Sequence, residues 1–295
     1  MAAAKSWLQN VAEGLRAFAH GGKRLESFRR PRIGLALGGG FARGIAHIGV
    51  LKALLDAKIP IDCIAGTSVG ALIGAGYVTG VTLEKMQRRA AATRFADFGK
   101  WRLSRMGFAS NDRLERYLYQ MSQFTRFEQC TIPLAIAATD LSTGEAVYFT
   151  EGEIGPALRA SCAYPGLFLP IEHQGRILVD GFLSSPVPVD AVKRLGADFV
   201  IAVWLESAGE GKQPDNMVEV ISRSFSIMQR NADVSWRRKA DVVIEPDVVR
   251  FAWDDFQQTP RLIAAGEAAT RSALPKIRAA LAPPERVPVA RTVYP

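Results

Sequence analysis

The chain has 295 residues, of which 48% are hydrophobic and 22% are charged, an ordinary globular composition that excludes a disordered protein. Its 37 Lys and Arg residues outnumber its 29 Asp and Glu residues, and the formal charge of +8 favours anionic partners such as acidic lipid surfaces or phosphate-bearing substrates. The three cysteines form no CxxC pair and the three histidines are scattered, so we expect reduced thiols, no metal site and a cytoplasmic protein.

Residues 1–32 are predicted to form an amphipathic helix followed by a basic linker. Five apolar side chains recur there at helical spacing: Trp7, Leu8, Val11, Leu15 and Phe18. The segment carries seven basic residues against two acidic ones, a local charge of +5, and it lacks the apolar region of a signal peptide. No signature of nucleic-acid recognition accompanies this charge, so we expect no nucleic-acid partner. Peripheral contact with an anionic membrane, on the inner membrane surface, is one expectation for the helix, and packing onto protein is the other.

Residues 33–282 are predicted to form one α/β domain. The apolar run Ile33–Leu37 ends at a run of glycines, and a helical pattern follows from residue 44 to residue 57. A second apolar run, Ile61–Ala65, ends at another tight turn and leads into a further helix. This repetition of strand, glycine turn and helix is typical of a mostly parallel sheet that is covered by helices.

The rest of this domain is predicted from weaker patterns. Residues 83–129 are helical in pattern and are expected to form a cap, with Asn111 or Asp112 at the start of one helix. Further strands are expected at Pro133–Ala138, Ala146–Thr150, Arg176–Val179, Phe199–Trp204 and Val242–Glu245. Thr259-Pro260 begins a terminal helix that runs to about Leu281, and the tail 283–295 is expected to be irregular.

Gly66-x-Ser68-x-Gly70 lies between a buried strand and a helix, where a nucleophilic serine is found on a strained turn. Only glycine leaves room for the neighbouring chain on either side of such a turn. The helix that follows points its amide dipoles towards Ser68 and would stabilise developing negative charge. An ordinary tight turn is the competing interpretation, but the placement of the pentapeptide favours a nucleophile.

A run of three glycines exposes consecutive backbone N–H groups between the first strand and the first helix. Acyl transfer requires such donors about 3 Å from the oxyanion. We therefore predict an oxyanion hole from the amides of Gly38, Gly39, Gly40 and Val69. A dinucleotide loop is disfavoured because Phe41 and Arg43 stand where glycine is required, and a P-loop because no Gly-Lys-Ser/Thr follows. Arg43 would either brace the loop or attract a lipid phosphate.

The serine requires a base, and the sequence offers two candidates. Asp180 directly follows the apolar strand 177–179, so the end of a core strand would fix the direction of its carboxylate. If this carboxylate is poorly solvated and lies near Ser68, its pKa would be raised and it could take the hydroxyl proton. A simple Asp-Gly turn is the alternative interpretation. The order Ser68, Asp140, His173 would instead suit a triad, although His173 falls in a predicted hairpin tip and His47 on the inner face of a core helix.

Several separate blocks of the sequence together resemble the patatin-like phospholipase family, in particular a bacterial branch similar to the esterase domain of neuropathy target esterase. The resemblance spans about residues 33–205 and continues more weakly to the terminal helix. The blocks are Gly38-Gly39-Gly40-Phe41-Ala42-Arg43-Gly44, Ala46-His47-Ile48-Gly49-Val50-Leu51, Gly66-Thr67-Ser68-Val69-Gly70, Ala160-Ser161-Cys162-Ala163-Tyr164-Pro165-Gly166-Leu167-Phe168 and Val179-Asp180-Gly181.

The resemblance implies a three-layer α/β/α fold and a Ser68–Asp180 dyad without histidine, with the glycine run as the oxyanion hole. It also implies hydrolysis of acyl esters in phospholipids, lysophospholipids or simpler lipids without a cofactor. The sequence departs from the family pattern at Phe41, where many relatives have glycine, and at Phe182, where a small residue is expected. Phe182 would stand beside the base, and with Arg43 it is a candidate substrate-binding residue. Because of Phe182, a second hypothesis stays open: a weakly active protein of this kind that binds lipid or regulates a partner.

Overall fold

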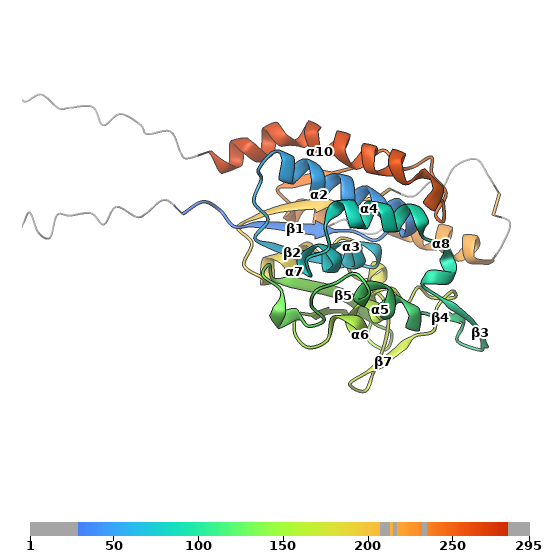
Figure 1. Cartoon of the computed structure of the whole chain (residues 1–295). Coiled ribbons are helices and arrows are strands. Elements are labelled where there is room, and N and C mark those ends of the chain that lie inside the picture. Colours follow the sequence, from blue (N-terminus) through green and yellow to red (C-terminus); the bar gives the residue numbers. More distant parts are fainter. Residues whose placement is uncertain (1–28, 207–212, 215–216, 232–234, 283–295) are drawn as a thin grey trace, which may run out of the picture. The chain divides into compact units, whose positions relative to one another are not determined.

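The computed structural model describes residues 29–206, 213–214, 217–231 and 235–282 (Figure 1). The predicted N-terminal helix and the tail 283–295 lie outside the described residues, so the domain boundaries at 32 and 282 stay predictions. Pro31–Leu281 forms one compact unit, which contains every element named below. No helix of the described residues has the length and apolar character needed to cross a membrane.

An eight-stranded mixed sheet forms the centre of this unit, in the order β10-β9-β1-β2-β5-β8-β7, with β6 also paired to β5. Neighbours from β10 to β5 are parallel, and the pairs made by β6, β7 and β8 are antiparallel. The strands are β1 (Ile33–Leu37), β2 (Cys63–Thr67), β5 (Leu134–Asp140), β6 (Ala146–Phe149), β7 (Ile171–His173), β8 (Arg176–Asp180), β9 (Phe199–Val203) and β10 (Val242–Ile244).

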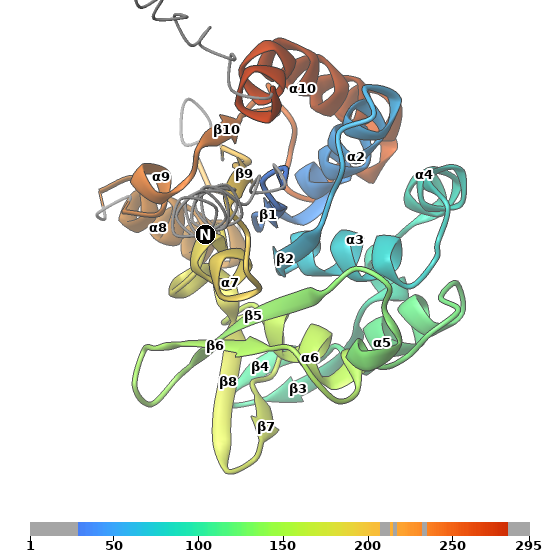
Figure 2. The ribbon, with the colours of Figure 1, turned by 90° about the vertical axis from the view of Figure 1, so that its left-hand side faces the viewer.

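Helices cover both faces of the sheet (Figure 2). On one face, large side chains such as Leu35, Ile64 and Ile136 pack against helices on that side. On the other face the strands present small residues, including Ala36 and Ala65, against α7 and α9. The helices are α2 (Ala46–Asp56), α3 (Val69–Val78), α4 (Leu83–Ala92), α5 (Asp112–Tyr119), α6 (Ile154–Ser161), α7 (Val189–Arg194), α8 (Met217–Asn231), α9 (Ser235–Lys239) and α10 (Thr259–Leu281). The predicted three-layer α/β/α fold is confirmed.

The prediction of an all-helical cap over residues 83–129 is wrong in its middle part. Helices α4 and α5 form, but between them lies a two-stranded antiparallel sheet of β3 (Lys100–Ser104) and β4 (Gly107–Ser110). β4 is held by the distant segment 167–169, since the amide of Ala109 donates to the carbonyl of Leu167 at 2.9 Å. Contacts with a segment so far along the chain override the local helical pattern.

Candidate active site

Ser68 stands on a sharp turn between β2 and α3, at the carboxyl edge of the sheet. Its backbone has φ 55° and ψ −121°, a strained conformation for a non-glycine residue. A Cβ on Gly66 would lie 2.4 Å from the backbone of Ala71, and one on Gly70 would lie 2.2 Å from the carbonyl oxygen of Leu37. Both glycines of the pentapeptide are therefore required by close backbone approach, as the sequence predicts.

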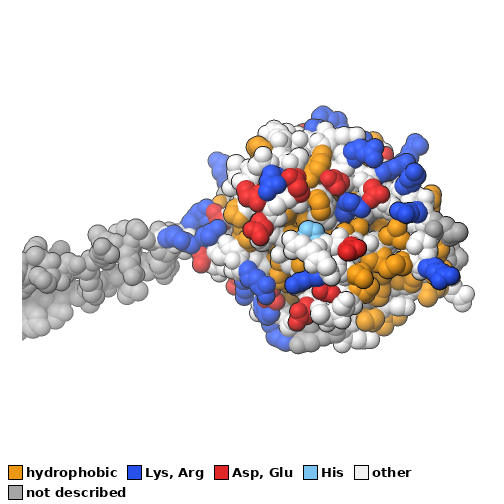
Figure 3. Space-filling model, turned by 90° about the horizontal axis from the view of Figure 1, so that it is seen from below, with side chains coloured by type: hydrophobic (Ala, Val, Ile, Leu, Met, Phe, Trp, Pro, Cys, Tyr) orange, Lys and Arg blue, Asp and Glu red, His pale blue; other side chains and the backbone are white. Residues whose placement is uncertain are grey.

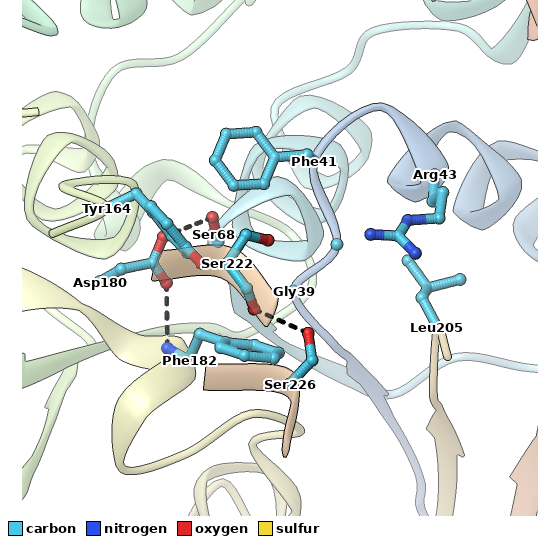
Figure 4. Close-up of a pocket in the computed structure, with 11 residues that line it drawn as sticks. Gly39, Phe41, Arg43, Ser68, Tyr164, Asp180, Phe182, Leu205, Ser222 and Ser226 are labelled. Atoms are coloured by element: carbon cyan, nitrogen blue, oxygen red, sulfur yellow. Dashed lines mark hydrogen bonds between the residues drawn. The ribbon is translucent and has the colours of Figure 1, made fainter. Parts of the chain in front are cut away.

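Asp180 ends β8 with its carboxylate beside this turn (Figure 4). The side chain is 1% exposed, and its Oδ2 accepts the hydroxyl of Ser68 at 2.7 Å. Its Oδ1 accepts the amide of Phe182 at 2.9 Å, which fixes the orientation of the carboxylate. The sheet register explains the encounter, because Thr67 and Asp180 lie opposite the consecutive residues Ala137 and Ala138 of β5. The structure thus brings the two predicted dyad residues together.

The electrostatic environment of Asp180 suits proton transfer near neutral pH. Burial raises the pKa of Asp180 to about 7, although the hydrogen bonds from Phe182 and Ser68 act in the opposite direction. A carboxylate with such a pKa is more basic than an exposed aspartate and is still ionised in part at neutral pH. In the described residues, no three His, Cys, Asp or Glu side chains are grouped so as to hold a metal ion.

The predicted oxyanion hole needs a correction in two of its four amides. The amide of Gly38 donates to the carbonyl of Val203 at 3.1 Å, and that of Gly39 donates to the carbonyl of Pro186 at the same distance. Neither can serve an oxyanion without giving up a backbone hydrogen bond. The glycines are needed for another reason, because a Cβ on Gly38 would lie 2.8 Å from the Val203 oxygen and one on Gly39 3.0 Å from the Phe182 ring.

Three other amides near Ser68 remain available. The N–H groups of Gly40 and Phe41 begin a short 3-10 helix, and that of Val69 begins α3, where helical amides have no partner within their own helix. None of the three donates to another described residue. Phe41 has φ 52°, so the loop turns sharply here. The oxyanion role of Gly40 and Val69 therefore stays a prediction that the structure leaves open, and the amide of Phe41, which we did not predict, is equally available.

Two hollows meet at Ser68, and both are also lined by Phe41 and Asp180. The more polar of the two, called the polar hollow below and shown in Figure 4, is lined further by Gly39, Gly40, Arg43, Tyr164, Phe182, Leu205, Ser222 and Ser226. The apolar hollow comprises about 620 Å³ of space, part of which is open solvent at its mouth, and it is lined further by Leu72, Leu114, Cys162, Phe168, Trp253 and Phe256. Ser68 therefore borders both the polar hollow and the apolar hollow.

Phe41 lines both of these hollows. Its ring meets Tyr164 edge to face at 4.9 Å between centroids, and it meets Trp253 in the same way at 5.1 Å. Both arrangements are favourable for aromatic pairs and hold the ring in place. The ring of Phe41 is thus a fixed part of the lining of both hollows.

The polar hollow contains one buried cation. Arg43 is only 7% exposed, and its guanidinium donates a hydrogen bond to the carbonyl of Glu206 at 3.3 Å. Its Nε is buried and has no hydrogen-bond partner among the described residues. Burial lowers the pKa of Arg43 to about 10, so it stays charged at neutral pH. Both roles predicted for Arg43, bracing of the loop and attraction of a phosphate, stay predictions, and the buried Nε has an N–H group free for a ligand.

Phe182, the second departure from the family pattern, does not block the base. Its ring stacks on Trp204 with an interplanar angle of 6° and centroids 6.5 Å apart. Its carbonyl accepts the side-chain amide of Gln229 at 2.8 Å, so the residue is held on both sides. The backbone amide of Phe182 thereby stays in place to hold Asp180.

The three members of the alternative triad are not brought together. Asp140 accepts the amide of Ser142 at 2.9 Å, and His173 packs edge-on against Phe149 in the hairpin of β7 and β8. His173 is paired with Arg176, four residues from Asp180 along β8, which corresponds to about 13 Å. His47 is fully buried, and its Nε2 lies 2.8 Å from the carbonyl oxygen of Gly38. Burial lowers the pKa of His47 to about 4, so it is a neutral core residue.

The sequence reasoning missed several residues of the site. Ser161 is fully buried, and its hydroxyl accepts the amide of Ser68 at 2.8 Å, which secures the strained turn from a different element. Tyr164 and Phe168 line the hollows from the loop after α6. All three belong to the block 160–168, which carried the family resemblance without any assigned role, and this was the signal for them. Ser222, Ser226 and Trp253 carried no signal in the sequence.

Comparison with known proteins gives a consistent set of relatives. The family model described as patatin-like phospholipase matches residues 35–193. An uncharacterized NTE family protein of Mycobacterium tuberculosis is 34% identical over 213 residues, which are 70% of this chain and 58% of that protein. Lysophospholipase nte1 of Aspergillus fumigatus is 34% identical over 200 residues, 66% of this chain but 13% of the fungal protein. The structure of VipD from Legionella pneumophila aligns with 12% identity and a TM-score of 0.49, covering 85% of this chain and 67% of VipD.

Proposed function

The chain belongs to the patatin-like phospholipase family, and on this basis we propose that it is a serine acyl hydrolase that cleaves carboxylic esters of lipids. The observation that carries the proposal is the hydrogen bond of 2.7 Å from the Ser68 hydroxyl to the buried carboxylate of Asp180, at the point where a polar and an apolar hollow meet. A nucleophile in contact with a base of raised pKa is the arrangement that acyl transfer requires.

In the proposed reaction, the Ser68 oxygen attacks the ester carbonyl while Asp180 accepts the hydroxyl proton. The carbonyl oxygen becomes an oxyanion, which the amides of Gly40, Phe41 and Val69 stabilise together with the N-terminal dipole of α3. Collapse of the intermediate breaks the ester bond, and Asp180 returns the proton to the leaving alcohol. Water then attacks the acyl-serine, again with Asp180 as base, and releases the fatty acid and free Ser68.

The two hollows support a lipid substrate with one acyl chain near Ser68. The apolar hollow is lined almost entirely by carbon, so it suits the acyl chain. The polar hollow would receive the alcohol side of the ester, where Arg43 and the hydroxyls of Tyr164 and Ser222 offer donors to a glycerophosphate. We therefore propose a phospholipid or lysophospholipid as substrate, in line with the name of the fungal relative.

Replacement of the dyad residues tests this proposal. Ser68→Ala and Asp180→Asn should each remove nearly all turnover of a short-chain ester and of a lysophospholipid, whereas His173→Ala should retain most of it. A fluorophosphonate probe should label the unaltered chain at Ser68 and leave Ser68→Ala unlabelled. If His173→Ala is as inactive as Ser68→Ala, the dyad is wrong and the triad is favoured. If the unaltered chain neither turns over ester nor takes the probe, the proposed hydrolase is wrong and the alternative of a lipid-binding or regulatory protein is favoured.

A further inference from the structure

The small sheet of β3 and β4 carries an unusual combination of exposed side chains. Trp101 is 70% exposed and Met106 is 57% exposed, although both are large and apolar. Lys100, Arg102 and Arg105 are exposed beside them, and none of these three makes an ion pair with a described residue. The stretch from residue 98 to residue 111 contains no acidic residue. An aromatic and a thioether side chain thus project from a purely cationic hairpin.

This hairpin is built onto the wall of the apolar hollow. Phe98 lines the hollow just before β3, and Asn111 and Leu114 line it just after β4. β4 is also bonded to the segment that holds Phe168, because the amide of Leu169 donates to the carbonyl of Ala109 at 3.0 Å. The exposed hairpin and the apolar hollow beside Ser68 are therefore both built on the segments that flank β3 and β4 and on the segment of Phe168.

Helix α8 presents a second apolar surface next to the hairpin. Its inner side packs on the hairpin's support, since Ile221 and Phe225 join the cluster of Ala109 and Phe168. Its outer side carries Met217, Val220 and Ile227, which recur at helical spacing and are 58%, 49% and 50% exposed. Figure 1 places α8, β3 and β4 at the same end of the molecule, and Figure 3 shows hydrophobic side chains gathered at that end of the lower face.

We propose that the β3–β4 hairpin, assisted by the outer side of α8, docks on an anionic phospholipid surface and sets the apolar hollow against it. Indole and thioether side chains enter the interfacial zone of a bilayer, and cations beside them attract acidic headgroups. A lipid surface accounts for both features, whereas an acidic protein would account for the charges alone. The inference deepens the proposed function, because a lipid would pass from the surface to Ser68 along the wall that the hairpin supports.

Vesicle co-sedimentation of the full chain tests the docking site. Two variants are compared with the unaltered protein, Trp101→Ala/Met106→Ala and Lys100→Gln/Arg102→Gln/Arg105→Gln, on vesicles of phosphatidylcholine with and without phosphatidylglycerol. Each cation near an anionic surface contributes about fivefold in affinity, so the triple variant should lose roughly 100-fold on anionic vesicles at low salt. The apolar variant should lose affinity for both kinds of vesicle.

Matched controls come from helices α2, α7 and α10, outside the hairpin and α8. Lys193→Gln/Lys276→Gln/Arg278→Gln removes three exposed cations, and Leu55→Ala removes an exposed apolar side chain. Both controls should bind nearly as the unaltered chain does. Equal losses in the controls and the hairpin variants would show that net charge or general hydrophobicity is responsible, and would overturn the proposal. So would a hairpin variant that binds as well as the unaltered chain, or an unaltered chain whose Trp101 and Met106 mediate self-association instead.

A second measurement does not depend on removing the apolar pair. Acyl-brominated phosphatidylcholine should quench tryptophan fluorescence of the bound chain, and Trp101→Phe should lose more of this quenching than Trp7→Phe. Unchanged quenching in Trp101→Phe would contradict insertion of the hairpin. Turnover of a soluble short-chain ester should persist in all these variants. The Ser68→Ala variant should still bind vesicles, so a failure of hydrolysis and a failure of docking are observed separately.

Discussion

Replacement of Asp180 by Asn should make the protein more stable at alkaline pH while removing its activity. Asp180 is 1% exposed, and its burial raises the pKa from the ordinary value of 3.8 to about 7. Asn keeps the shape of the side chain and can still accept the amide of Phe182, but it carries no charge. The substitution therefore removes the free energy that the folded state spends on holding an ionised carboxylate away from water.

The sign and size of this change in the free energy of unfolding follow from proton linkage. Between about pH 4 and pH 7 the unfolded chain has lost the Asp180 proton while the folded chain still holds it, so stability falls as pH rises. The contribution is fully present below the unfolded pKa and is lost as pH passes through the folded pKa. A shift of about three units corresponds to about 4 kcal/mol at the limit, of which roughly 2.5 kcal/mol is lost between pH 5 and pH 8.

Denaturant unfolding at these two pH values measures the effect. The difference in unfolding free energy between Asp180→Asn and the unaltered chain should grow by about 2.5 kcal/mol from pH 5 to pH 8. Ser68→Ala is the matched control, because it is equally inactive but keeps the buried carboxyl, so its stability should still fall with pH. In the unaltered chain, kcat/KM for a soluble ester should rise with pH through about 7, since only the carboxylate accepts the proton. A constant stability difference would refute the account of Asp180 as a buried base.

Three further predictions concern the metal, the turn and the N-terminus. EDTA should leave ester turnover unchanged, and a loss that a divalent ion restores would contradict the dyad mechanism. Ser161→Ala should lower the unfolding free energy by about 0.5–1.5 kcal/mol, because the partly buried hydrogen bond from the Ser68 amide to the Ser161 hydroxyl is lost. It should also lower kcat, and an unchanged kcat would show that the turn holds without Ser161. Deletion of residues 1–30 should weaken sedimentation with anionic vesicles and preserve turnover of a soluble ester; unchanged sedimentation, or a chain that no longer folds, would assign the segment a packing role.

The parts of the site that were predicted correctly depend on local chemistry. Ser68 lies on the predicted turn because the two glycines, the preceding apolar strand and the following helix are all within one short stretch of sequence. Asp180 was predicted because an apolar strand ends directly before it. Continuous apolar runs indicated buried parallel strands in the same way, and β1, β2 and β5 are buried along their whole length.

The errors arise where distant segments decide the outcome. Gly38 and Gly39 were expected to point their amides at an oxyanion, but Val203 and Pro186, about 150 residues away in sequence, accept those hydrogen bonds. No local pattern shows which amides of a glycine run will be taken by a neighbouring strand. Strand pairing in β3 and β4 was missed for the same reason, since β4 is secured by residues 167–169.

The walls of the site extend beyond the stretch that the family model matches. That match ends at residue 193 and includes Ser68, Asp180 and the glycine loop. Trp204, which stacks on Phe182, and Trp253, which meets Phe41, lie after it, as do the serines of α8. The two aromatic departures from the family pattern are therefore each held by an aromatic residue of the C-terminal third. The matched stretch supplies the proposed dyad and most of the lining of both hollows, and the C-terminal third adds Leu205, Ser222, Ser226, Trp253 and Phe256 to that lining. We therefore expect that exchanging these five residues changes the choice of substrate without removing turnover, because the proposed dyad stays in place.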